Sequence, residues 1–221
     1  MPRNGADVAG QSLSDKAYAE ILRMIVNLEL APGSALSEQQ IATRLGIGRT
    51  PIREALRNLI REGLVTSYPS RGLVITDINQ ASQLRLLEVR RELDRLMARL
   101  AAERATPAER EAFRRIAAGM RASMEGEPDY AAFMELDKEF NSLMLASAKN
   151  EFAAKSTGLM NGLWARFWNA YYEVVADVPK VARLHAEIGE AIADKLPREA
   201  AEASDRLIDY ITEFTRATLD H

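Results

Sequence analysis

The sequence lacks cysteine altogether and has only two histidines in 221 residues. Without cysteine the chain cannot form a disulfide, a thiolate nucleophile or a cysteine-rich zinc site. It has no uninterrupted apolar run of roughly 18 residues, the length that a membrane-spanning helix needs. Its first residues also lack the apolar stretch of a signal peptide. We therefore expect a cytoplasmic protein with no membrane segment.

Charge of either sign is nearly balanced over the whole chain, with a net value of −3. The balance differs between segments, however, and charge has to be evaluated segment by segment. Residues 1–77 carry nine Lys or Arg and eight Asp or Glu, whereas residues 78–221 carry twenty and twenty-four. Six arginines lie between residues 44 and 71, with only two acids, Glu54 and Glu62. This segment is therefore a local positive stripe in a mildly acidic chain.

Residues 1–12 show no periodicity, and we expect them to form a flexible tail. Apolar residues then recur at helical spacing, and Ser14 is the predicted N-cap of this first helix. A second helix is predicted to begin at Ser37, where Gln40 would complete a capping box. Gly46 is expected to end that helix in the left-handed conformation that glycine adopts at little cost.

A third helix is predicted after Gly48, with Pro51 in its first turn and Gly63 at its end. Two short strand-like runs follow, at residues 64–68 and 72–76, and they indicate a β-hairpin. Three short helices followed by a hairpin are typical of a winged helix-turn-helix. We therefore predict such a DNA-binding domain over residues 13–77.

Beyond residue 77 the pattern is helical to the end. We predict helices over residues 80–104, 107–124, 129–148, 151–176, 179–195 and 198–219. The expected fold class is mainly α: an N-terminal winged helix-turn-helix followed by a C-terminal all-α helical bundle. Residues 78–221 would form this second domain, which we expect to bind an effector and to dimerise.

A helix-turn-helix places its second helix in the major groove of DNA, and Gly46-Ile47-Gly48 has the composition of the connecting turn. The planar guanidinium group of arginine matches both guanine edges and phosphates. We therefore expect DNA contacts from the third helix, from the hairpin tip and from the helix starts that favour anions. The candidate residues are Ser37, Gln39, Arg49, Thr50, Arg53, Arg57, Arg71 and Gly72. An arginine stripe by itself is more often a solvated helix face, so the prediction depends on the order and spacing of all these elements.

The same residues resemble the GntR family of bacterial transcription regulators. The resemblance is carried by residues 30–34 (LAPGS), 36–42 (LSEQQIA), 45–56 (LGIGRTPIREAL), 62–65 (EGLV) and Arg71-Gly72. It implies base and phosphate contacts from Arg49 and Arg53, supported by Thr50, Gln39 and Gly72. Gly48 departs from the family pattern, which usually has serine there, so a possible hydroxyl contact to phosphate is lost.

The helical half resembles the FCD-type effector-binding domain of the FadR-like branch of that family. The segments that carry this looser resemblance are 87–94 (LEVRRELD), 98–102 (ARLAA), 136–141 (LDKEFN) and 184–188 (LHAEI). Many members of the branch hold a divalent metal with one aspartate and three histidines. Asp137 and His185 match two of those ligands, but Asn141 replaces a second histidine. Leu207 stands in place of the third, or Tyr210 if the preceding loop carries an insertion.

Three interpretations of this region stay open. Asp137 and His185 could hold a metal. Asp137, Asn141 and His185 could instead form a polar pocket that binds a small organic anion with help from Arg90. Alternatively, His185 could be an ordinary hydrogen-bonded histidine beside a vestigial pocket. Trp164 and Trp168, at helical spacing, are expected either to pack in the core or to line that pocket. The remaining histidine, His221, is expected to be exposed to solvent at the C-terminus.

The function expected from the sequence is that of a homodimeric repressor, rather than an enzyme, that binds a near-palindromic operator in double-stranded DNA. A small organic-acid effector in the helical domain would shift operator affinity by binding one state of the dimer more tightly. Two alternative functions are also considered. One is a constitutive DNA-binding dimer with a vestigial pocket. The other is a metal-dependent helical enzyme, which is disfavoured because no complete ligand set and no nucleophile–base motif appears.

Overall fold

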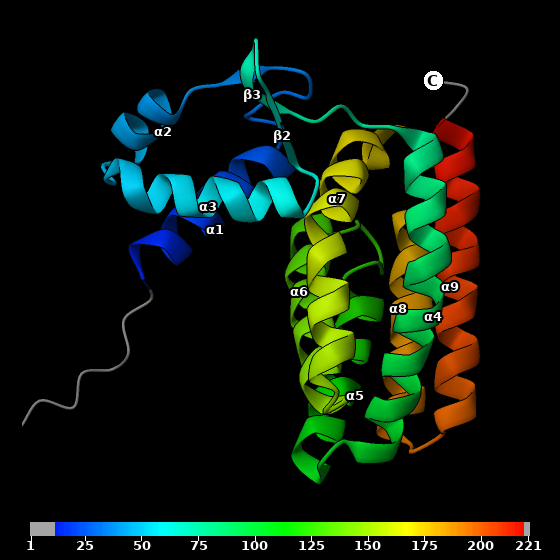
Figure 1. Ribbon diagram of the computed structural model, residues 1–221. Coiled ribbons are helices and arrows are strands. Elements are labelled where there is room, and N and C mark those ends of the chain that lie inside the picture. The colour runs from blue at the N-terminus through cyan, green and yellow to red at the C-terminus, as the bar shows by residue number, and fades with distance from the viewer. Residues whose placement is uncertain (1–11, 219–221) are drawn as a thin grey trace, which may run out of the picture. The chain divides into compact units, whose positions relative to one another are not determined.

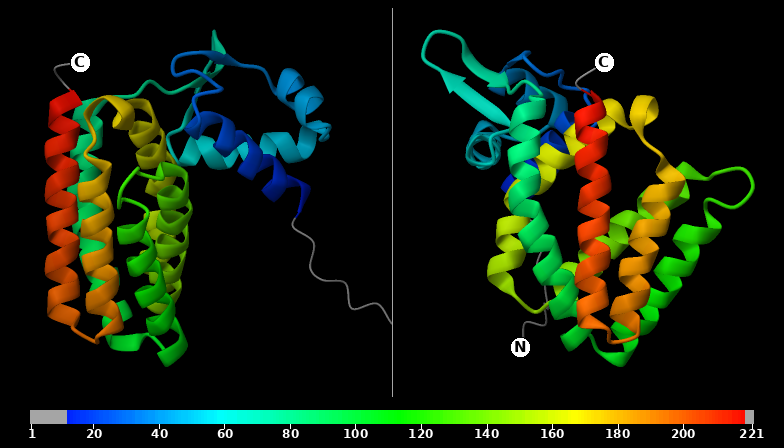
Figure 2. Two further views of the ribbon diagram at one scale, coloured as in Figure 1. Left: turned by 180° about the vertical axis from the view of Figure 1, so that it is seen from behind. Right: turned by 90° about the vertical axis from the view of Figure 1, so that its right-hand side faces the viewer.

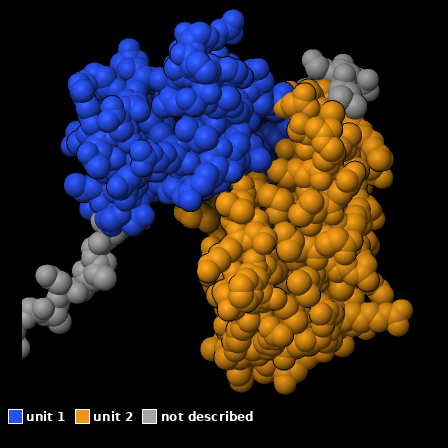
Figure 3. Space-filling model, viewed as in Figure 1, with its two compact units in different colours: residues 1–78, 162–170 blue, residues 79–161, 171–221 orange. Residues whose placement is uncertain are grey.

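The computed structural model describes the backbone of residues 12–218 and all of their side chains except those of residues 174 and 175. Most of the predicted tail, residues 1–11, and His221 lie outside this range. The chain forms two compact units, which Figure 3 distinguishes by colour. Unit 1 consists of the described residues up to Ile78 together with residues 162–170, and unit 2 of residues 79–161 and those from 171 onwards. The sequence did not predict that residues 162–170 belong to unit 1.

Unit 1 is a winged helix-turn-helix. Its elements, labelled in Figure 1, are α1 (Leu13–Val26), β1 (Ala35–Leu36), α2 (Glu38–Leu45), α3 (Arg49–Arg61), β2 (Val65–Tyr68) and β3 (Gly72–Ile75). The strands form an antiparallel sheet in the order β1-β3-β2, in which β2 and β3 are the two arms of the predicted hairpin. Strand β1 was not predicted, because its two residues are too few to show an alternating pattern.

The predicted helix starts are correct for α2 and wrong for α1. Helix α1 begins two residues earlier than expected: Ser12 is its N-cap, and Ser12 and Asp15 form a reciprocal capping box, whereas Ser14 lies inside the helix. At α2 the Ser37 hydroxyl accepts a hydrogen bond from the backbone N–H of Gln40, which is one half of the predicted box. Gly46 ends α2 at a φ of 64°, as expected for the turn of a helix-turn-helix.

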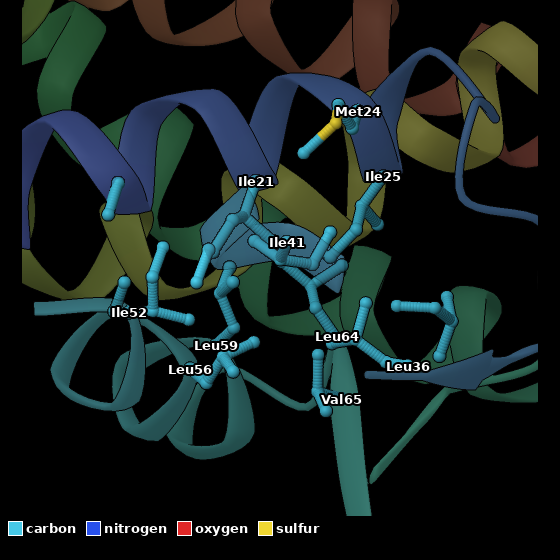
Figure 4. Packing of buried hydrophobic residues seen from close by; sticks show 14 residues of the cluster. Ile21, Met24, Ile25, Leu36, Ile41, Ile52, Leu56, Leu59, Leu64 and Val65 are labelled. Carbon is cyan, nitrogen blue, oxygen red and sulfur yellow. The ribbon is translucent and has the colours of Figure 1, made fainter. Parts of the chain in front are cut away.

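A single apolar cluster holds unit 1 together. Side chains from α1, α2, α3, β1 and the start of β2 converge in it, as Figure 4 shows. Its least exposed members, at 2% exposure or less, include Ile21, Ile52, Leu56, Leu59 and Leu64. Burial of side chains of this size stabilises a fold by about 1.5–3 kcal/mol each, so the cluster is the main force that orients α3.

The middle of α7 (Glu151–Val175) completes this cluster. Leu163 packs against it. Gly162 lies so close to the cluster that an added Cβ would be 2.6 Å from Leu64 Cδ1 and 2.9 Å from Leu22 Cδ1. The amide of Asn169 donates a hydrogen bond of 3.0 Å to the carbonyl of Val26 at the end of α1. Residues 162–170 are therefore a structural part of the DNA-binding unit, although the sequence places them far from it.

Unit 2 is the predicted helical bundle. It contains α4 (Gln80–Arg104), α5 (Pro107–Ala122), α6 (Tyr130–Ser147), the ends of α7, α8 (Val178–Ala193) and α9 (Pro197–Ala217). Helices α4, α8 and α9 lie side by side in both Figure 1 and Figure 2. Ion pairs from Arg91 to Asp209 (2.5 Å) and from Arg95 to Asp205 (2.8 Å) join α4 to α9. In the described part of the chain, no helix is both long and apolar enough to cross a membrane.

The two glycines of α7 give a matched test of this packing. Gly158 has no atom within 4 Å of an added Cβ, so Gly158→Ala should stabilise the helix by up to about 1 kcal/mol. Gly162→Ala should gain the same helix preference but overpack the Leu64 contact, which typically costs about 1–3 kcal/mol. We expect Gly162→Ala to be the less stable variant by that difference in denaturant titrations. Equal stabilisation by both substitutions would show that α7 does not pack tightly against Leu64 and Leu22.

Candidate DNA-binding surface and effector site

The apolar face of α3 determines which of its side chains remain outside. Ile52, Ala55, Leu56 and Leu59 are buried in the cluster. The side chains on the other face are therefore exposed: Arg49, Thr50, Arg53, Arg57 and Arg61. Helix α3 thus presents a row of guanidinium groups to solvent, as the sequence predicted.

The start of α3 is suited to an anion. Its N-cap is Gly48, in extended conformation (φ −61°, ψ 158°), and no side chain within residues 12–218 caps it. The N–H groups of the first helical turn are therefore left for an external acceptor, and the helix dipole favours a negative charge there. The glycine that replaces the usual serine of the resembling family leaves this end of the helix open.

Two arginines of α3 are held by side chains at the start of α2. Arg53 Nε donates to Glu38 Oε2 at 2.7 Å, and the Arg49 guanidinium donates to the side-chain oxygen of Gln39. Arg53 and Glu38 are 58% and 34% exposed, and exposed pairs of this kind contribute at most about 1 kcal/mol. A phosphate or a guanine edge can therefore replace these partners at little cost. The sequence predicted a role for Gln39 and did not single out Glu38.

The hairpin tip is exposed as predicted. Arg71 and Gly72 lie at the turn, where the Arg71 N–H donates to the Tyr68 carbonyl at 3.3 Å. Gly72 has a φ of 72°, a conformation that non-glycine residues adopt only with strain. Tyr68, opposite Gly72 in the hairpin, is 48% exposed. We add Tyr68 as a surface residue that the sequence analysis missed, because an aromatic residue in a short strand is more often buried.

The C-terminal end of α3 is held by a side chain of α1. The Tyr18 hydroxyl donates to both carboxylate oxygens of Glu62, at 2.9 and 3.0 Å, just after the end of α3. Burial raises the pKa of Tyr18, and the hydrogen bond to Glu62 and its charge raise it further. Burial also raises the pKa of Glu62, against the hydrogen bond from Tyr18 and the charge of Arg61. Glu62, one of the two acids in the basic stripe, thus faces inward.

In unit 2, His185 and Asp137 form the centre of a polar cluster. His185 is 8% exposed, and its Nε2 lies 3.0 Å from Asp137 Oδ1. The other ring nitrogen, Nδ1, lies 2.9 Å from the carbonyl oxygen of Val181. The rings of Phe140 and Phe133 meet the imidazole edge-to-face, at centroid distances of 5.6 and 6.1 Å. Because both ring nitrogens face acceptors, the doubly protonated ring satisfies both hydrogen bonds.

Burial and the hydrogen-bond partners of His185 shift its pKa in opposite directions. Burial lowers its pKa, but the Asp137 charge and the hydrogen bonds to Asp137 and Val181 raise it by more, so that the pKa is raised overall. The charge of Arg90 acts against this rise. The structure brings Asp137 and His185 into direct contact, and the effector role of these residues and of Arg90 stays a prediction.

The donor set does not fit a metal ion. No group of three or more His, Cys, Asp or Glu side chains within the described residues has a suitable arrangement. Asp137 and His185 are hydrogen-bonded directly to each other. The amide nitrogen of Asn141 donates to the Asp137 backbone carbonyl at 2.8 Å instead of supporting a third ligand. Two donors and a neutral amide give an incomplete coordination shell.

Three other predicted effector-site residues have different surroundings. Trp164 and Trp168 belong to unit 1, where Trp164 lies 6.1 Å from the ring of Phe167 and 5.9 Å from that of Trp168. These ring contacts favour the packing alternative for the two tryptophans, and the pocket-lining alternative stays an untested prediction. The Tyr210 hydroxyl accepts a hydrogen bond of 2.6 Å from the backbone N–H of Asp177, at the start of α8. Within the part of the chain that the structure describes, no hydrogen bond joins Tyr210 to Asp137 or His185.

Arg90 also has a partner that the sequence analysis did not consider. Its guanidinium binds Asp94 Oδ2 at 2.9 and 3.2 Å, four residues along α4. The two side chains are only 12% and 9% exposed. Spacing four on a helix is a recognisable signal for such a pair. Asp94 therefore offsets much of the positive charge that Arg90 would offer to an anion.

Comparison with known proteins identifies both units. The model described as "Bacterial regulatory proteins, gntR family" matches residues 13–75, and the FCD domain model matches residues 85–210. The chain belongs to the GntR family. Unit 1 carries its helix-turn-helix, and unit 2 is an FCD effector domain.

Relatives of this GntR-family protein are transcription regulators. The chain is 40% identical over 76 residues to an uncharacterized HTH-type transcriptional regulator of Streptomyces ambofaciens, covering 34% of this chain and 32% of that one. It is 25% identical over 206 residues to the HTH-type transcriptional repressor RspR of Escherichia coli, covering 93% and 90%. Among solved structures, Escherichia coli McbR/YncC has the same fold, with a TM-score of 0.78 at 17% identity over 95% of this chain and 100% of that chain. The family and these relatives are regulators rather than enzymes, which removes the metal-dependent enzyme from consideration.

The raised pKa of His185 predicts a pH dependence of the FCD domain. Because the folded state binds the proton more tightly, this contribution is fully present below the ordinary histidine pKa of about 6.5. It is lost as the pH rises through the higher pKa of the folded state. We expect the denaturant concentration at the unfolding midpoint to decrease as the pH is raised above about 6.5. In Asp137→Asn the charge that raises the pKa of His185 is removed, and burial and the charge of Arg90 oppose only the hydrogen bond to Val181, so this decrease should disappear or reverse. A midpoint that rises with pH in the unmodified protein would contradict this assignment.

Proposed function

We propose that this GntR-family regulator binds a near-palindromic operator as a homodimer, with α3 of each protomer in a major groove. The observation that carries the proposal is the division of α3 into a buried apolar face and an exposed arginine face. A two-fold dimer presents two such helices to two half-sites, about one helical turn apart. This arrangement doubles the number of contacts and requires the operator to share the symmetry of the protein.

Each part of the surface has a proposed role. Arg49, Arg53 and Arg57 contact guanine edges or phosphates in the major groove, since a guanidinium group can bind guanine O6 and N7 together. The polar side chains at the helix starts hold the backbone of the duplex and so fix the register of α3. These are Ser37, Gln39 and Thr50. Arg71, at the exposed wing tip beside Gly72, contacts a phosphate outside the groove that α3 occupies.

The FCD half is proposed to control operator affinity through a small organic-acid effector. The guanidinium of Arg90 and a protonated His185 offer two positive groups near Asp137 and Asn141, and a carboxylate can bind between such groups. An acid bound there would favour one state of the dimer and shift DNA affinity by its preference for that state. We propose a repressor role, which is supported by the similarity to RspR, a transcriptional repressor.

One observation favours a second candidate, a dimer that binds DNA constitutively. The charges of the cluster already neutralise one another, through Asp137 with His185 and Asp94 with Arg90. A cluster that is internally satisfied can be purely structural. An effector would then have to displace at least one of these internal partners.

Arg53→Ala tests the DNA surface. On an operator selected from a random-sequence duplex pool, we expect a loss of about 1–3 kcal/mol of specific binding, which is about 5- to 150-fold in Kd. Arg114→Ala, at an exposed position on α5, is the matched control and should leave Kd unchanged. Titrations at a fixed salt concentration make the comparison. If the two variants bind the operator equally well, α3 is not the recognition helix.

A thermal-shift screen separates the two candidate functions. The probes are small mono-, di- and tricarboxylic acids, with divalent cations and a chelator as separate arms. A true effector at about 100 times its Kd stabilises the folded state by about 2.7 kcal/mol, which should raise Tm by roughly 5–10 °C in a chain of this size. The shift should vanish in Arg90→Gln, with Arg114→Ala again the control. Failure of every acid to raise Tm would support the constitutive dimer.

A further inference from the structure

Thr76 directly follows the wing strand β3, whose last residue, Ile75, is hydrogen-bonded to Gly33 and Ser34. The backbone N–H of Thr76 donates to the Leu64 carbonyl at 3.1 Å, and its hydroxyl donates to the Gly63 carbonyl at 2.8 Å. Gly63 and Leu64 form the turn between α3 and the hairpin. Thr76 therefore joins the returning arm of the wing to the end of the recognition helix. Its own carbonyl group still has to be satisfied from elsewhere.

That partner comes from α7. Arg166 Nη1 donates to the Thr76 carbonyl at 2.7 Å, and Nη2 reaches the Asp77 carbonyl at 3.4 Å. Both residues lie within unit 1. The guanidinium thus holds two successive carbonyl groups at the point where the chain leaves the wing.

Arg166 is an expensive residue for this position. It is 3% exposed, and its Nε has no hydrogen-bond partner within residues 12–218. Burial lowers its pKa, and only the charge of Asp77 acts in the other direction. A buried cation that binds carbonyl groups rather than a carboxylate carries a desolvation penalty that no opposite charge in direct contact offsets. A leucine or methionine would fill the same space without this cost, so packing alone does not account for an arginine.

The part of α7 that carries Arg166 is held in place on both sides of this residue. Gly162 lies against Leu64, and Asn169 holds the end of α1 by its hydrogen bond to Val26. These contacts flank Arg166 on both sides along the helix. The side chain therefore projects from a fixed support, and the carbonyl groups it holds cannot shift without breaking its hydrogen bonds.

We infer that Arg166 is a positioning residue for the wing: it locks the end of β3 and so sets where the hairpin places Arg71 against DNA. It touches no DNA itself. The inference extends the proposed function, since it depends on Arg71 contacting a phosphate. It also gives residues 162–170 of α7 a role in DNA binding, although they lie outside the helix-turn-helix sequence.

A double-mutant cycle tests it with a probe that needs no known operator. Binding of the full-length protein to a mixed-sequence duplex of about 30 base pairs is measured as a function of salt concentration. Each phosphate contact contributes about −0.9 to the slope of log K against log salt. Arg71→Ala should reduce the slope by about one for each protomer bound. Arg166→Gln should reduce it by a similar amount, and the double variant should show no further reduction.

The possible outcomes separate the two hypotheses. If Arg71→Ala leaves the slope unchanged, the proposed wing contact itself fails. If Arg71→Ala reduces the slope while Arg166→Gln does not, or if the two reductions add, Arg166 does not act through the wing. A general loss of folded protein lowers the amount of active protein but leaves the slope unchanged, so it cannot imitate the expected result.

Arg166→Lys covers the case in which Arg166→Gln does not fold. Lysine keeps the charge but replaces the two-pronged donor with a single ammonium group. We expect faster amide hydrogen exchange over residues 65–76 in this variant, with exchange in α3 unchanged. Wing exchange at the rate of the unmodified protein would overturn the inference.

Discussion

The packing of the inner face of α3 is the constraint on which the rest of unit 1 depends. Ile52, Leu56 and Leu59 fit into one cluster with side chains of α1, and they fix the rotation of α3 about its own axis. A helix with one face buried must expose the opposite one, so the arginines point outward without any interaction of their own to hold them there. Their weak partners on α2 can then be exchanged for DNA. The apolar packing beneath this surface therefore decides which side chains of α3 face outward.

Residues 162–170 of α7 extend that constraint beyond the helix-turn-helix. They close the same cluster and hold the end of the wing through Arg166. The remaining parts of α7 belong to the FCD unit. One continuous helix therefore contributes residues to both units.

Local patterns predicted most of the fold. The positions of glycine and proline predicted the ends of α2, α3 and the six later helices within a few residues, because these two residue types favour turns and helix ends. Contacts between distant segments were not predictable in the same way. Periodicity could not show that Trp164 and Trp168 pack with the DNA-binding unit, nor that Arg166 reaches Thr76, 90 residues earlier. Among the site residues, the arginine face of α3 followed from spacing, whereas the partners Glu38 and Asp94 emerged only from the structure.

The most direct test of the central claim is guanine N7 methylation interference on a selected operator. Methylation blocks the major-groove edge that an arginine of α3 would bind. The account predicts interference at guanines in two symmetric half-sites, with centres about one helical turn apart. Binding that tolerates methylation at every guanine of the operator would contradict it, because the arginine face of α3 would then not lie in the major groove.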